Sequence, residues 1–518
     1  MIVGDIVERN ARLSPHQPAV VCGTRRLTHA ALAERARRLA NALHARGLRR
    51  GDRVAVLAQN CPEYLEAYAA SELSGFITVT VNYRLAPPEV AFILQDSQPA
   101  ALLFEAPYAA LVAQVRPSLA AQLHYVSIGE AIAWAEEYEA LLASAATGPL
   151  AERPGGEDTV YLMYTSGTTG TPKGVCLSQR AMAHMALVTS LESDVVPTDR
   201  VLLTMPLYHI GAKCTQLAYH LRGCMVVLHR TFDPRAVLET IATERITATL
   251  LAPTMLRALL DLPDFDRYDR SSLRSVFYSA APMPVDLLRR GIAAFGPIFM
   301  QLYGMTEIGA IGTGLHKHQH VLDGDPIAVR RLASAGQPLV TCEVRVVRDD
   351  GTDCAPGEPG EVLVRSPAVM QGYWNNPAAT AEVLHDGWLH TGDIGTLDAE
   401  HYLFIVDRKK DMIVSGGENI YPREVETALE THPAVREAAV IGVPDEYWGE
   451  AVKAFVVLAP GASVTEAELI EHTRRQIASY KKPRSIEFVS DLPRLPNGKV
   501  RKSMLRAPYW TDRERAIT

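Results

Sequence analysis

The sequence lacks the features that mark several classes of protein. Its seven cysteines are scattered, odd in number and form no Cys-x-x-Cys pair, which is simplest to explain by reduced thiols in a cytosolic protein. No uninterrupted apolar run reaches the roughly 18 residues that a membrane helix needs, so we expect no integral membrane segment. The first residues carry acids where a secretory signal carries bases. We therefore expect a cytoplasmic protein.

Charge of one sign is also missing. Lys and Arg number 52 and Asp and Glu number 59, which gives a net charge of −7, and no tail of like charges is present. This balance offers no basic surface for nucleic acid, so nucleic-acid partners are not expected. The hydrophobic content of 47% is that of a globular protein. Because 518 residues are too many for one ordinary core, two or more domains are expected.

Helices and strands alternate through the first two thirds of the chain. Residues 28–43 have apolar positions at helical spacing, and residues 51–58 are typical of a turn that leads into a buried strand. Further buried strands are predicted at 201–205 and 248–252. Such alternation favours an α/β fold with largely parallel sheets. Residues 146–158, rich in Ala, Gly, Pro and Glu, are predicted to be a connection.

The pattern changes near residue 335. Residues 343–348 and 360–365 alternate apolar and polar side chains, and an Asp-Asp-Gly turn lies between them. This predicts antiparallel strands in a small, barrel-like β subdomain. After residue 407 a compact α+β unit is expected, in which Pro422 starts a helix and strands lie at 438–443 and 453–458. Thr465 and Glu468 form the capping box of a further helix.

The most specific segment is Tyr-Thr-Ser-Gly-Thr-Thr-Gly-Thr-Pro-Lys-Gly at residues 164–174. It follows a predicted buried strand, and its glycines, hydroxyls and backbone N–H groups are suited to wrapping phosphate oxygens. Lys173 adds a positive charge for an anion. The segment is not a P-loop, because Pro and Gly flank the lysine where that motif has Gly before and Ser or Thr after.

In its exact order of residues, this segment resembles the phosphate-binding signature of the adenylate-forming superfamily. That superfamily contains acyl-CoA synthetases, stand-alone adenylation domains and firefly-type luciferases. Other segments resemble its motifs in the same order, and the resemblance extends from about residue 20 to residue 505. Agreement among several segments supports membership more strongly than any one of them does.

The resemblance implies a nucleotide site with bound magnesium. Glu307, with Thr165 as a further contact, is expected to ligate Mg²⁺, and Asp393 is expected to bind the ribose hydroxyls. Arg408 is expected near the ribose, and Ser279 to Pro282 along the adenine. The residues implied in ATP binding are Thr165, Ser166, Gly167, Thr168, Thr169, Gly170, Lys173, Ser279, Ala280, Ala281, Pro282, Gln301, Tyr303, Gly304, Thr306, Glu307, Asp393, Arg408 and Lys499.

The resemblance also implies two domains that move. A large adenylation domain is expected at residues 1–406 and a small mobile domain at 407–518, with a hinge near Asp407. Lys499 would touch both the carboxylate and the α-phosphate, where its positive charge would stabilise the negative charge that develops in the transition state. After rotation, Gly416 and Gly417 would line the tunnel for the pantetheine of CoA. The catalytic candidates are Lys499, Glu307, His209 and Lys173.

Residues 206–214 resemble the segment that lines the acyl pocket, and His209 is the candidate gate between the acyl and thiol sites. No Asp or Glu occurs between Pro206 and Gly223, which disfavours an amino-acid adenylating enzyme. No residue argues for oxygen chemistry of the luciferase type. A non-enzymatic binding module is disfavoured by the intact Glu307 and Lys499. An acyl-AMP ligase that serves a carrier protein stays open, although the loop at 415–422 favours CoA.

We therefore expect an acyl-CoA ligase that forms acyl-AMP from a carboxylic acid and ATP, and then an acyl-CoA thioester. Its small-molecule partners would be the acid, ATP with Mg²⁺, and CoA, and a homodimer is left open. Residues 308–314, a predicted pocket wall, are small and apolar and suit a chain or ring of moderate size. Lys213 would either pair with a polar group of the acid or extend to solvent.

Two residues depart from the pattern of the family. Thr396 and His401 stand where aromatic and glycine residues, respectively, are common in the family. Histidines alternate at positions 316, 318 and 320 in a polar stretch, which is more typical of a hydrated loop than of a metal site.

Overall fold

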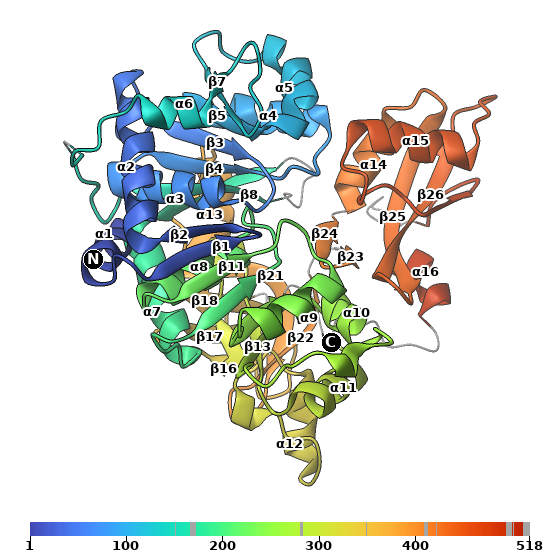
Figure 1. The fold of residues 1–518 in the computed structure, drawn as a ribbon. Helices are drawn as coiled ribbons and strands as arrows, with labels where there is room; N and C mark the ends of the chain where they lie inside the picture. The colour runs from blue at the N-terminus through green and yellow to red at the C-terminus, as the bar shows by residue number, and fades with distance from the viewer. Residues whose placement is uncertain are drawn as a thin grey trace.

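The computed structural model describes residues 1–150, 152–165, 172–279, 283–348, 350–408, 413–420, 422–493, 500 and 502–510. Within these residues the chain forms a large α/β part and a smaller α+β unit after residue 412, which lie next to each other in Figure 1. No helix of the described residues is long and apolar enough to cross a membrane. All seven cysteines are free thiols.

Two mixed sheets build the large part from the described residues. In the nine-stranded sheet the order is β16-β15-β14-β13-β12-β10-β11-β1-β2. Its strands are β1 (Pro18–Cys22), β2 (Arg25–Thr28), β10 (Arg200–Leu203), β11 (Met225–Leu228), β12 (Ala248–Leu251), β13 (Ser275–Tyr278), β14 (Phe299–Tyr303), β15 (Thr313–Leu315) and β16 (Gln337–Pro338). From β1 through β11, β10, β12 and β13 to β14 the pairing is parallel.

The second sheet of the described large part has eight strands in the order β19-β9-β8-β4-β3-β5-β6-β7. They are β3 (Arg53–Leu57), β4 (Ile77–Val81), β5 (Ala101–Glu105), β6 (His124–Ile128), β7 (Glu136–Glu137), β8 (Thr159–Thr165), β9 (Lys173–Ser178) and β19 (Gly372–Tyr373). Pairing is parallel from β8 to β7, whereas β8, β9 and β19 pair antiparallel. The predicted parallel α/β architecture is therefore confirmed.

Helices fill the space between these sheets and cover their outer faces. Buried along its whole length, α3 (Pro62–Ser74) contacts β1 of one sheet and β3 and β4 of the other. Also mostly buried, α8 (Ile210–Leu221) packs against α7 (Gln179–Glu192). The other helices of this part are α1 (Gly4–Leu13), α2 (His29–Ala45), α4 (Pro87–Ser97), α5 (Ala109–Val115), α6 (Tyr138–Ala143), α9 (Pro234–Thr243), α10 (Pro253–Leu260), α11 (Val285–Phe295), α12 (Pro326–Arg330) and α13 (Pro377–Val383).

A separate antiparallel sheet confirms the predicted β subdomain. It contains β17 (Glu343–Val347), β18 (Gly360–Arg365), β20 (Leu384–His385), β21 (Trp388–Leu397) and β22 (Leu403–Arg408). The β21–β22 hairpin ends at Arg408, which pairs in register with Asp393. This hairpin leads from the large part to the unit that follows.

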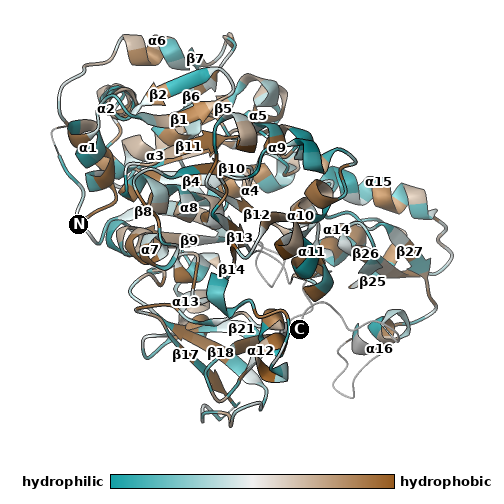
Figure 2. Ribbon diagram, turned by 60° about the horizontal axis from the view of Figure 1, so that its bottom comes forward, coloured by the Kyte–Doolittle hydropathy of each residue, from teal (hydrophilic) through white to brown (hydrophobic). Residues whose placement is uncertain are grey.

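The C-terminal unit places helices against a sheet of five described strands. Its strands are β23 (Ile413–Ser415), β24 (Glu418–Ile420), β25 (Val435–Asp445), β26 (Gly449–Leu458) and β27 (Ser485–Phe488), and its helices are α14 (Pro422–Glu430), α15 (Glu466–Gln476) and α16 (Lys502–Arg506). As predicted, α14 starts at Pro422 and Thr465 caps α15 through a capping box with Glu468. In Figure 2 the polar residues of α15 colour it largely teal, whereas the strands at the centre of the large part are largely brown.

Candidate active site

The predicted phosphate loop starts and ends on neighbouring strands. β8 ends at Thr165 and β9 begins at Lys173, and these two residues are paired in an antiparallel register. Ser166, Gly167, Thr168, Thr169 and Gly170 lie outside the described residues. The pairing therefore positions the Thr165 hydroxyl and the Lys173 ammonium group at the two ends of the loop.

Glu307 lies close to this hairpin through a tyrosine. It sits in a short 3-10 helix after β14, and 6% of its surface is exposed. The Tyr373 hydroxyl donates a hydrogen bond to Glu307 Oε1 at 3.0 Å, and Lys173 Nζ lies 4.9 Å from the centre of the Tyr373 ring. Tyr373 therefore contacts both the Lys173 ammonium group and the Glu307 carboxylate. The sequence alone does not show this link.

The expected ribose site is built by β14 and β21. Asp393 is buried on β21, and its Oδ2 accepts a hydrogen bond from the Tyr303 hydroxyl at 2.7 Å. Gly304 follows Tyr303 at the end of β14, where a Cβ would overlap the carbonyl group of Ala310. Only glycine fits this position, since the overlap is with backbone. Arg408 is described by its backbone, opposite Asp393, and Ala280, Ala281 and Pro282 lie outside the described residues.

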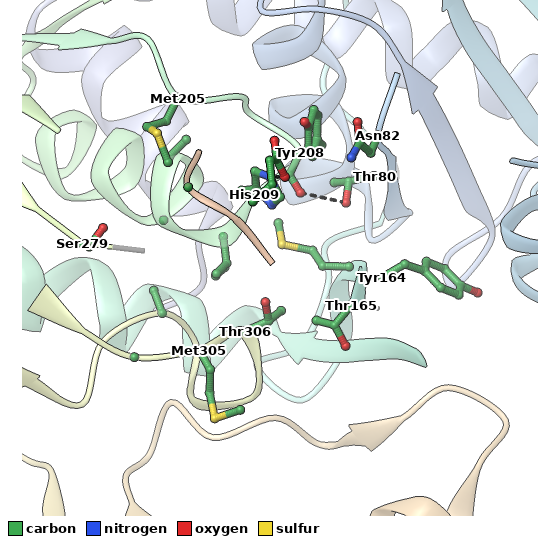
Figure 3. A pocket seen from close by; sticks show the side chains of 18 of the residues that line it. Thr80, Asn82, Tyr164, Thr165, Met205, Tyr208, His209, Ser279, Met305 and Thr306 are labelled. Atoms are coloured by element: carbon green, nitrogen blue, oxygen red, sulfur yellow. Dashed lines mark hydrogen bonds and ion pairs between the residues drawn. The ribbon is translucent and has the colours of Figure 1, made fainter. Parts of the chain in front are cut away.

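A cavity of about 260 Å³ joins many of the predicted residues. It is lined by Thr165, Ser279, Thr306 and Glu307 from the expected nucleotide site, by His209, and by Gly417 of the C-terminal unit. Figure 3 shows Thr165, Thr306, Ser279 and His209 on different segments around this cavity. Its apolar wall comes from Met205, Ile210, Ala212, Leu250, Leu302, Met305, Ala310 and Ile311. Gln301 and Tyr303 of β14, Asp393, Lys173 and Gly416 are not among the lining residues.

His209 stands where the two parts of the chain meet. It precedes α8, its ring centroid lies 4.4 Å from that of Tyr208, and its Nε2 lies 3.6 Å from Glu418 Oε2. Arg84 donates a hydrogen bond to Glu418 Oε1 at 2.7 Å. Burial alone would raise the pKa of Glu418, but His209, Arg84 and Lys481 outweigh it and lower that pKa. Glu418 is therefore held ionised by groups of the large part and of its own unit.

The glycines before Glu418 shape the approach to the cavity. Gly416 and Gly417 have φ angles of +60° and +82°, in the left-handed region that favours glycine. A Cβ on Gly416 would lie 2.6 Å from the Trp448 ring, and one on Gly417 would lie 3.3 Å from Ala252 Cβ. The chain thus turns sharply here and passes close to the large part. Lys499 lies outside the described residues.

Lys213 takes neither of the two roles considered from the sequence. Its side chain is 1% exposed, and its Nζ donates to Glu72 Oε1 and to Gln216 Oε1, each at 2.6 Å. It also lies 4.2 Å from the centre of the Tyr68 ring. Lys213 points away from solvent and is absent from the residues that line the cavity. It forms a buried ion pair between α8 and α3.

Sequence reasoning missed Arg84, Glu418 and Tyr373. Glu418 lies inside a segment that the family resemblance highlighted, so the motif could have directed attention to it. Arg84 and Tyr373 lie outside the recognised motifs, and their partners are 334 and 66 residues away in sequence. Only the folded chain brings these pairs together.

Comparison with known proteins identifies the family. The AMP-binding enzyme family matches residues 7–374, and the AMP-binding enzyme C-terminal domain matches residues 424–499. The feruloyl-CoA synthase of an Amycolatopsis species is 42% identical over 504 residues, which cover 97% of this chain and 98% of that protein. The structure of the amide bond synthetase McbA from Marinactinospora thermotolerans matches with a TM-score of 0.90 at 35% identity, covering 98% of this chain and 100% of that chain.

A third relative, o-succinylbenzoate CoA synthetase from Bacillus subtilis, has been solved in different complexes. A double mutant bound with its product analogue OSB-NCoA matches with a TM-score of 0.86 at 33% identity, covering 97% of this chain and 98% of that chain. In complex with its acyl-adenylate intermediate OSB-AMP, that enzyme matches with a TM-score of 0.70 at 32% identity, covering 97% of both chains. The chain belongs to the AMP-binding enzyme family of the adenylate-forming superfamily, and it is an ATP-dependent acid–CoA ligase.

Proposed function

We propose that this ligase activates an aromatic carboxylic acid as its acyl-adenylate and then transfers the acyl group to the thiol of CoA. The observation that carries the proposal is the cavity that Thr165, Thr306 and Glu307 share with His209 and Gly417. A nucleotide site, an apolar acid pocket and a glycine turn from the C-terminal unit open into one space. The first half-reaction needs the nucleotide site and the acid pocket next to each other, and the second needs the glycine turn beside the acid pocket as well.

Glu307 and Thr165 are the groups that would hold Mg²⁺. These two residues and Thr306 line the cavity, and oxygen donors are the ligands that this cation prefers. No group of three or more His, Cys, Asp or Glu side chains suited to a metal occurs in the part of the chain that the structure describes. This fits a cation that takes most of its ligands from phosphates and water. The bound ion would neutralise charge on the phosphates.

The remaining nucleotide contacts are proposed from the family resemblance, with the described geometry in support. We assign the phosphate-facing charge to Lys173 and the ribose contact to Asp393, whose orientation the Tyr303 hydroxyl supports at 2.7 Å. Lys499 is proposed to touch the acid and the α-phosphate during adenylation, where its charge would stabilise the transition state. Its replacement should therefore affect the first half-reaction far more than the second.

We propose that residues 1–406 and 407–518 act as two domains that alternate between the half-reactions. The structure matches o-succinylbenzoate CoA synthetase better in its complex with the product analogue than in its complex with the acyl-adenylate. This difference supports the proposed alternation. The structure would then represent the thioester-forming arrangement, with Gly417 at the cavity and Glu418 near His209. His209 would open or close the path from the acyl group to the thiol.

The acid is proposed to be aromatic and without a distal charge. Feruloyl-CoA synthase is named for an aromatic acid without a second carboxylate, and the pocket wall that includes Met205 and Ile311 is apolar. Lys213 is buried in an ion pair with Glu72 and does not line this pocket, so no lysine of α8 would pair with a second carboxylate. A ring of moderate size with small neutral substituents suits such a wall.

Cellular location and assembly complete the proposal. The seven free thiols favour a reducing compartment such as the cytoplasm. A homodimer is proposed on the exposed Leu187 and Leu191, which lie one turn apart on α7 with 48% and 66% of their surfaces accessible. Sedimentation of the wild type and of a Leu187→Ser, Leu191→Ser variant tests that assembly.

The decisive experiment measures AMP and thioester with ATP, Mg²⁺, CoA and a panel of acids. The panel spans hydroxycinnamates, arylacetates, benzoates, dicarboxylates and alkanoates of several lengths. We expect AMP and thioester together, with hydroxycinnamates or arylacetates turned over fastest. Turnover of alkanoates alone would refute the proposed acid. AMP without thioester would point to a carrier protein or, given the likeness to McbA, to an amine as the acceptor, so both are added in a second assay.

Lys499→Ala separates the two half-reactions. We expect pyrophosphate exchange to fall by about a hundredfold or more, since one preorganised charge at a transition state is worth about this much. Thioester formation from supplied acyl-AMP should stay within about threefold of the wild type. Equal losses in both steps would contradict the assigned role.

A further inference from the structure

A second set of charged side chains is buried at the contact between the large part and the C-terminal unit. Lys481 follows α15, and its Nζ donates to Glu89 Oε1 at 2.8 Å and to Glu424 Oε1 at 2.5 Å. The side chain of Lys481 is 4% exposed, and those of the two glutamates are each 8% exposed. Three ionisable groups are thus withdrawn from water at one place.

The two ion pairs differ in what they join. Glu424 on α14 and Lys481 belong to the same unit, so their contact can persist when that unit moves. Glu89 lies on α4 of the large part, 392 residues from Lys481. Its other carboxylate oxygen accepts a hydrogen bond from the Ala86 backbone N–H at 2.8 Å, which fixes Glu89 in the first turn of α4. Of these two ion pairs, only the one between Lys481 and Glu89 joins the two parts of the chain.

Other charged and titratable groups surround this cluster. On the C-terminal unit, Glu418 precedes α14 and Tyr480 is adjacent to Lys481. On the large part, Arg84 pairs with Glu418, His209 lies near the same carboxylate, and Asn82 Nδ2 lies 3.4 Å from the Tyr480 hydroxyl. Tyr480 and Lys481 both line the cavity together with Gly417 and Glu418. The cluster therefore adjoins the path that is proposed for the thiol.

We propose that Lys481 is a positioning residue for thioester formation, which holds the C-terminal unit in its present place by bridging Glu424 to Glu89. The inference rests on the proposed alternation of the two domains. In another arrangement of the unit, Lys481 would keep Glu424 and lose Glu89. Lys481 would thus favour the second half-reaction without touching the substrates of the first.

The charges at this contact also make the position of the C-terminal unit depend on pH. We call the unit docked when Lys481 contacts Glu89, as it does here. One ammonium group meets two carboxylates, so docking brings a second negative charge into a buried place. Burial raises the pKa of Glu424 to about 8; Lys481 opposes this shift, and the neighbouring Glu89 adds to it. The present arrangement therefore favours the protonated form of Glu424. As the pH rises through about 8 that proton is lost, and the docked population is expected to fall.

Lys481→Met removes the charge and keeps most of the side-chain length. The test measures acid-dependent pyrophosphate exchange and, separately, the release of thioester from supplied acyl-AMP and CoA. We expect exchange within about twofold of the wild type and a thioester rate lowered about tenfold or more, since removal of one partner leaves carboxylates buried without their cation. Lys453→Met is the matched control, because Lys453 pairs with Glu487 at 3.1 Å within the C-terminal unit.

The pH dependence gives a second, independent readout. Glu89→Gln keeps an oxygen for the Ala86 N–H but removes the extra charge, so Lys481 and Glu424 are balanced without a proton. We divide the thioester rate of Glu89→Gln by that of the wild type at each pH. This ratio is expected to rise by up to about tenfold from pH 7 to pH 9. About tenfold is the largest change that the loss of one proton with a pKa near 8 can cause over this range. The ratio cancels the ionisation of the CoA thiol, which both proteins share.

The outcomes separate this inference from the proposed function. If the wild type makes AMP and thioester but Lys481→Met lowers both half-reactions equally or neither, the positioning role is refuted. A flat ratio for Glu89→Gln would refute the link to protons. If the wild type shows no acid-dependent exchange at all, the proposed function itself fails. Thermal unfolding of both variants and of Lys453→Met confirms that folded proteins are compared.

Discussion

The Tyr373 hydroxyl donates a hydrogen bond to Glu307 Oε1 at 3.0 Å and thereby ties the strand β19 to the short helix that carries the proposed magnesium ligand. The same ring lies 4.9 Å from Lys173 Nζ, at the end of the phosphate loop. Tyr373 thus orients one group of the nucleotide site and packs against another. A group that holds a metal ligand in place contributes to the affinity of the site for the metal.

Tyr373→Phe is expected to weaken magnesium binding in the presence of ATP. The change removes the hydroxyl and keeps the ring beside Lys173, so loss of the hydrogen bond is isolated from loss of packing. We expect the Mg²⁺ concentration for half-maximal adenylation to rise by about tenfold, at the lower end of what outer partners of metal ligands contribute. The measurement is a magnesium titration of pyrophosphate exchange. An unchanged titration with a lowered maximal rate would contradict this role.

Lys213→Met is expected to destabilise the fold and leave the choice of acid unchanged. Lys213 and Glu72 are buried together, and removing one partner of such a pair costs about 3–5 kcal/mol because the other charge stays unpaired. Equilibrium unfolding in urea measures the loss. The double variant Lys213→Met, Glu72→Gln should lose less than the sum of the single losses. A changed order of preferred acids with unaltered stability would contradict the structural role.

Much of the fold could be predicted because its signals are local. Thr465 and Glu468 form a capping box that predicts the start of α15. Pro422 is the first residue of α14, a position where proline is common. Alternation of helices and buried strands likewise predicted parallel-type sheets in the large part, although not that there are two of them. Such patterns depend on residues only a few positions apart, so one sequence is enough to recognise them.

What could not be predicted depends on partners far away in the chain. Lys213 finds Glu72 from 141 residues away, and nothing in the residues around Lys213 indicates a buried pair. The three alternating histidines show the same limit. His320 is not hydrated, as its spacing suggested, but is buried against Tyr278 with 9% of its surface exposed. Topology, rather than local pattern, decides which charged and polar groups are withdrawn from water.

The buried His320 predicts a dependence of stability on pH. Its Nε2 lies 3.0 Å from the Tyr278 hydroxyl oxygen, and burial lowers its pKa to about 4. An unfolded histidine has a pKa of about 6.5, so the unfolded chain binds more protons between these values. The contribution of His320 is therefore complete above pH 6.5 and is lost as the pH falls towards 4.

His320→Gln should flatten this part of the pH profile. The wild type is expected to lose up to about 3 kcal/mol of unfolding free energy from this group between pH 6.5 and pH 4, from the free energy that each unit of pKa represents. His318→Gln is the control, because His318 is exposed on the same short segment. Urea unfolding at a series of pH values provides the measurement. Parallel profiles for the wild type and His320→Gln would show that His320 is not the responsible group.

His401 stands where glycine is common in the family, and the structure shows why glycine suits the position. Its φ angle is +62°, in the left-handed region, within the turn that joins β21 to β22. A side chain in this region costs about 1–2 kcal/mol, and the gain from glycine is reduced by its greater freedom in the unfolded chain.

We therefore expect His401→Gly to raise the unfolding free energy by about 0.5–1 kcal/mol. Both half-reactions should keep their wild-type rates, because the turn contributes no residue to the cavity. Urea unfolding of His401→Gly beside His401→Ala distinguishes relief of strain from simple loss of the imidazole. If alanine stabilises as much as glycine, the backbone conformation is not the cause.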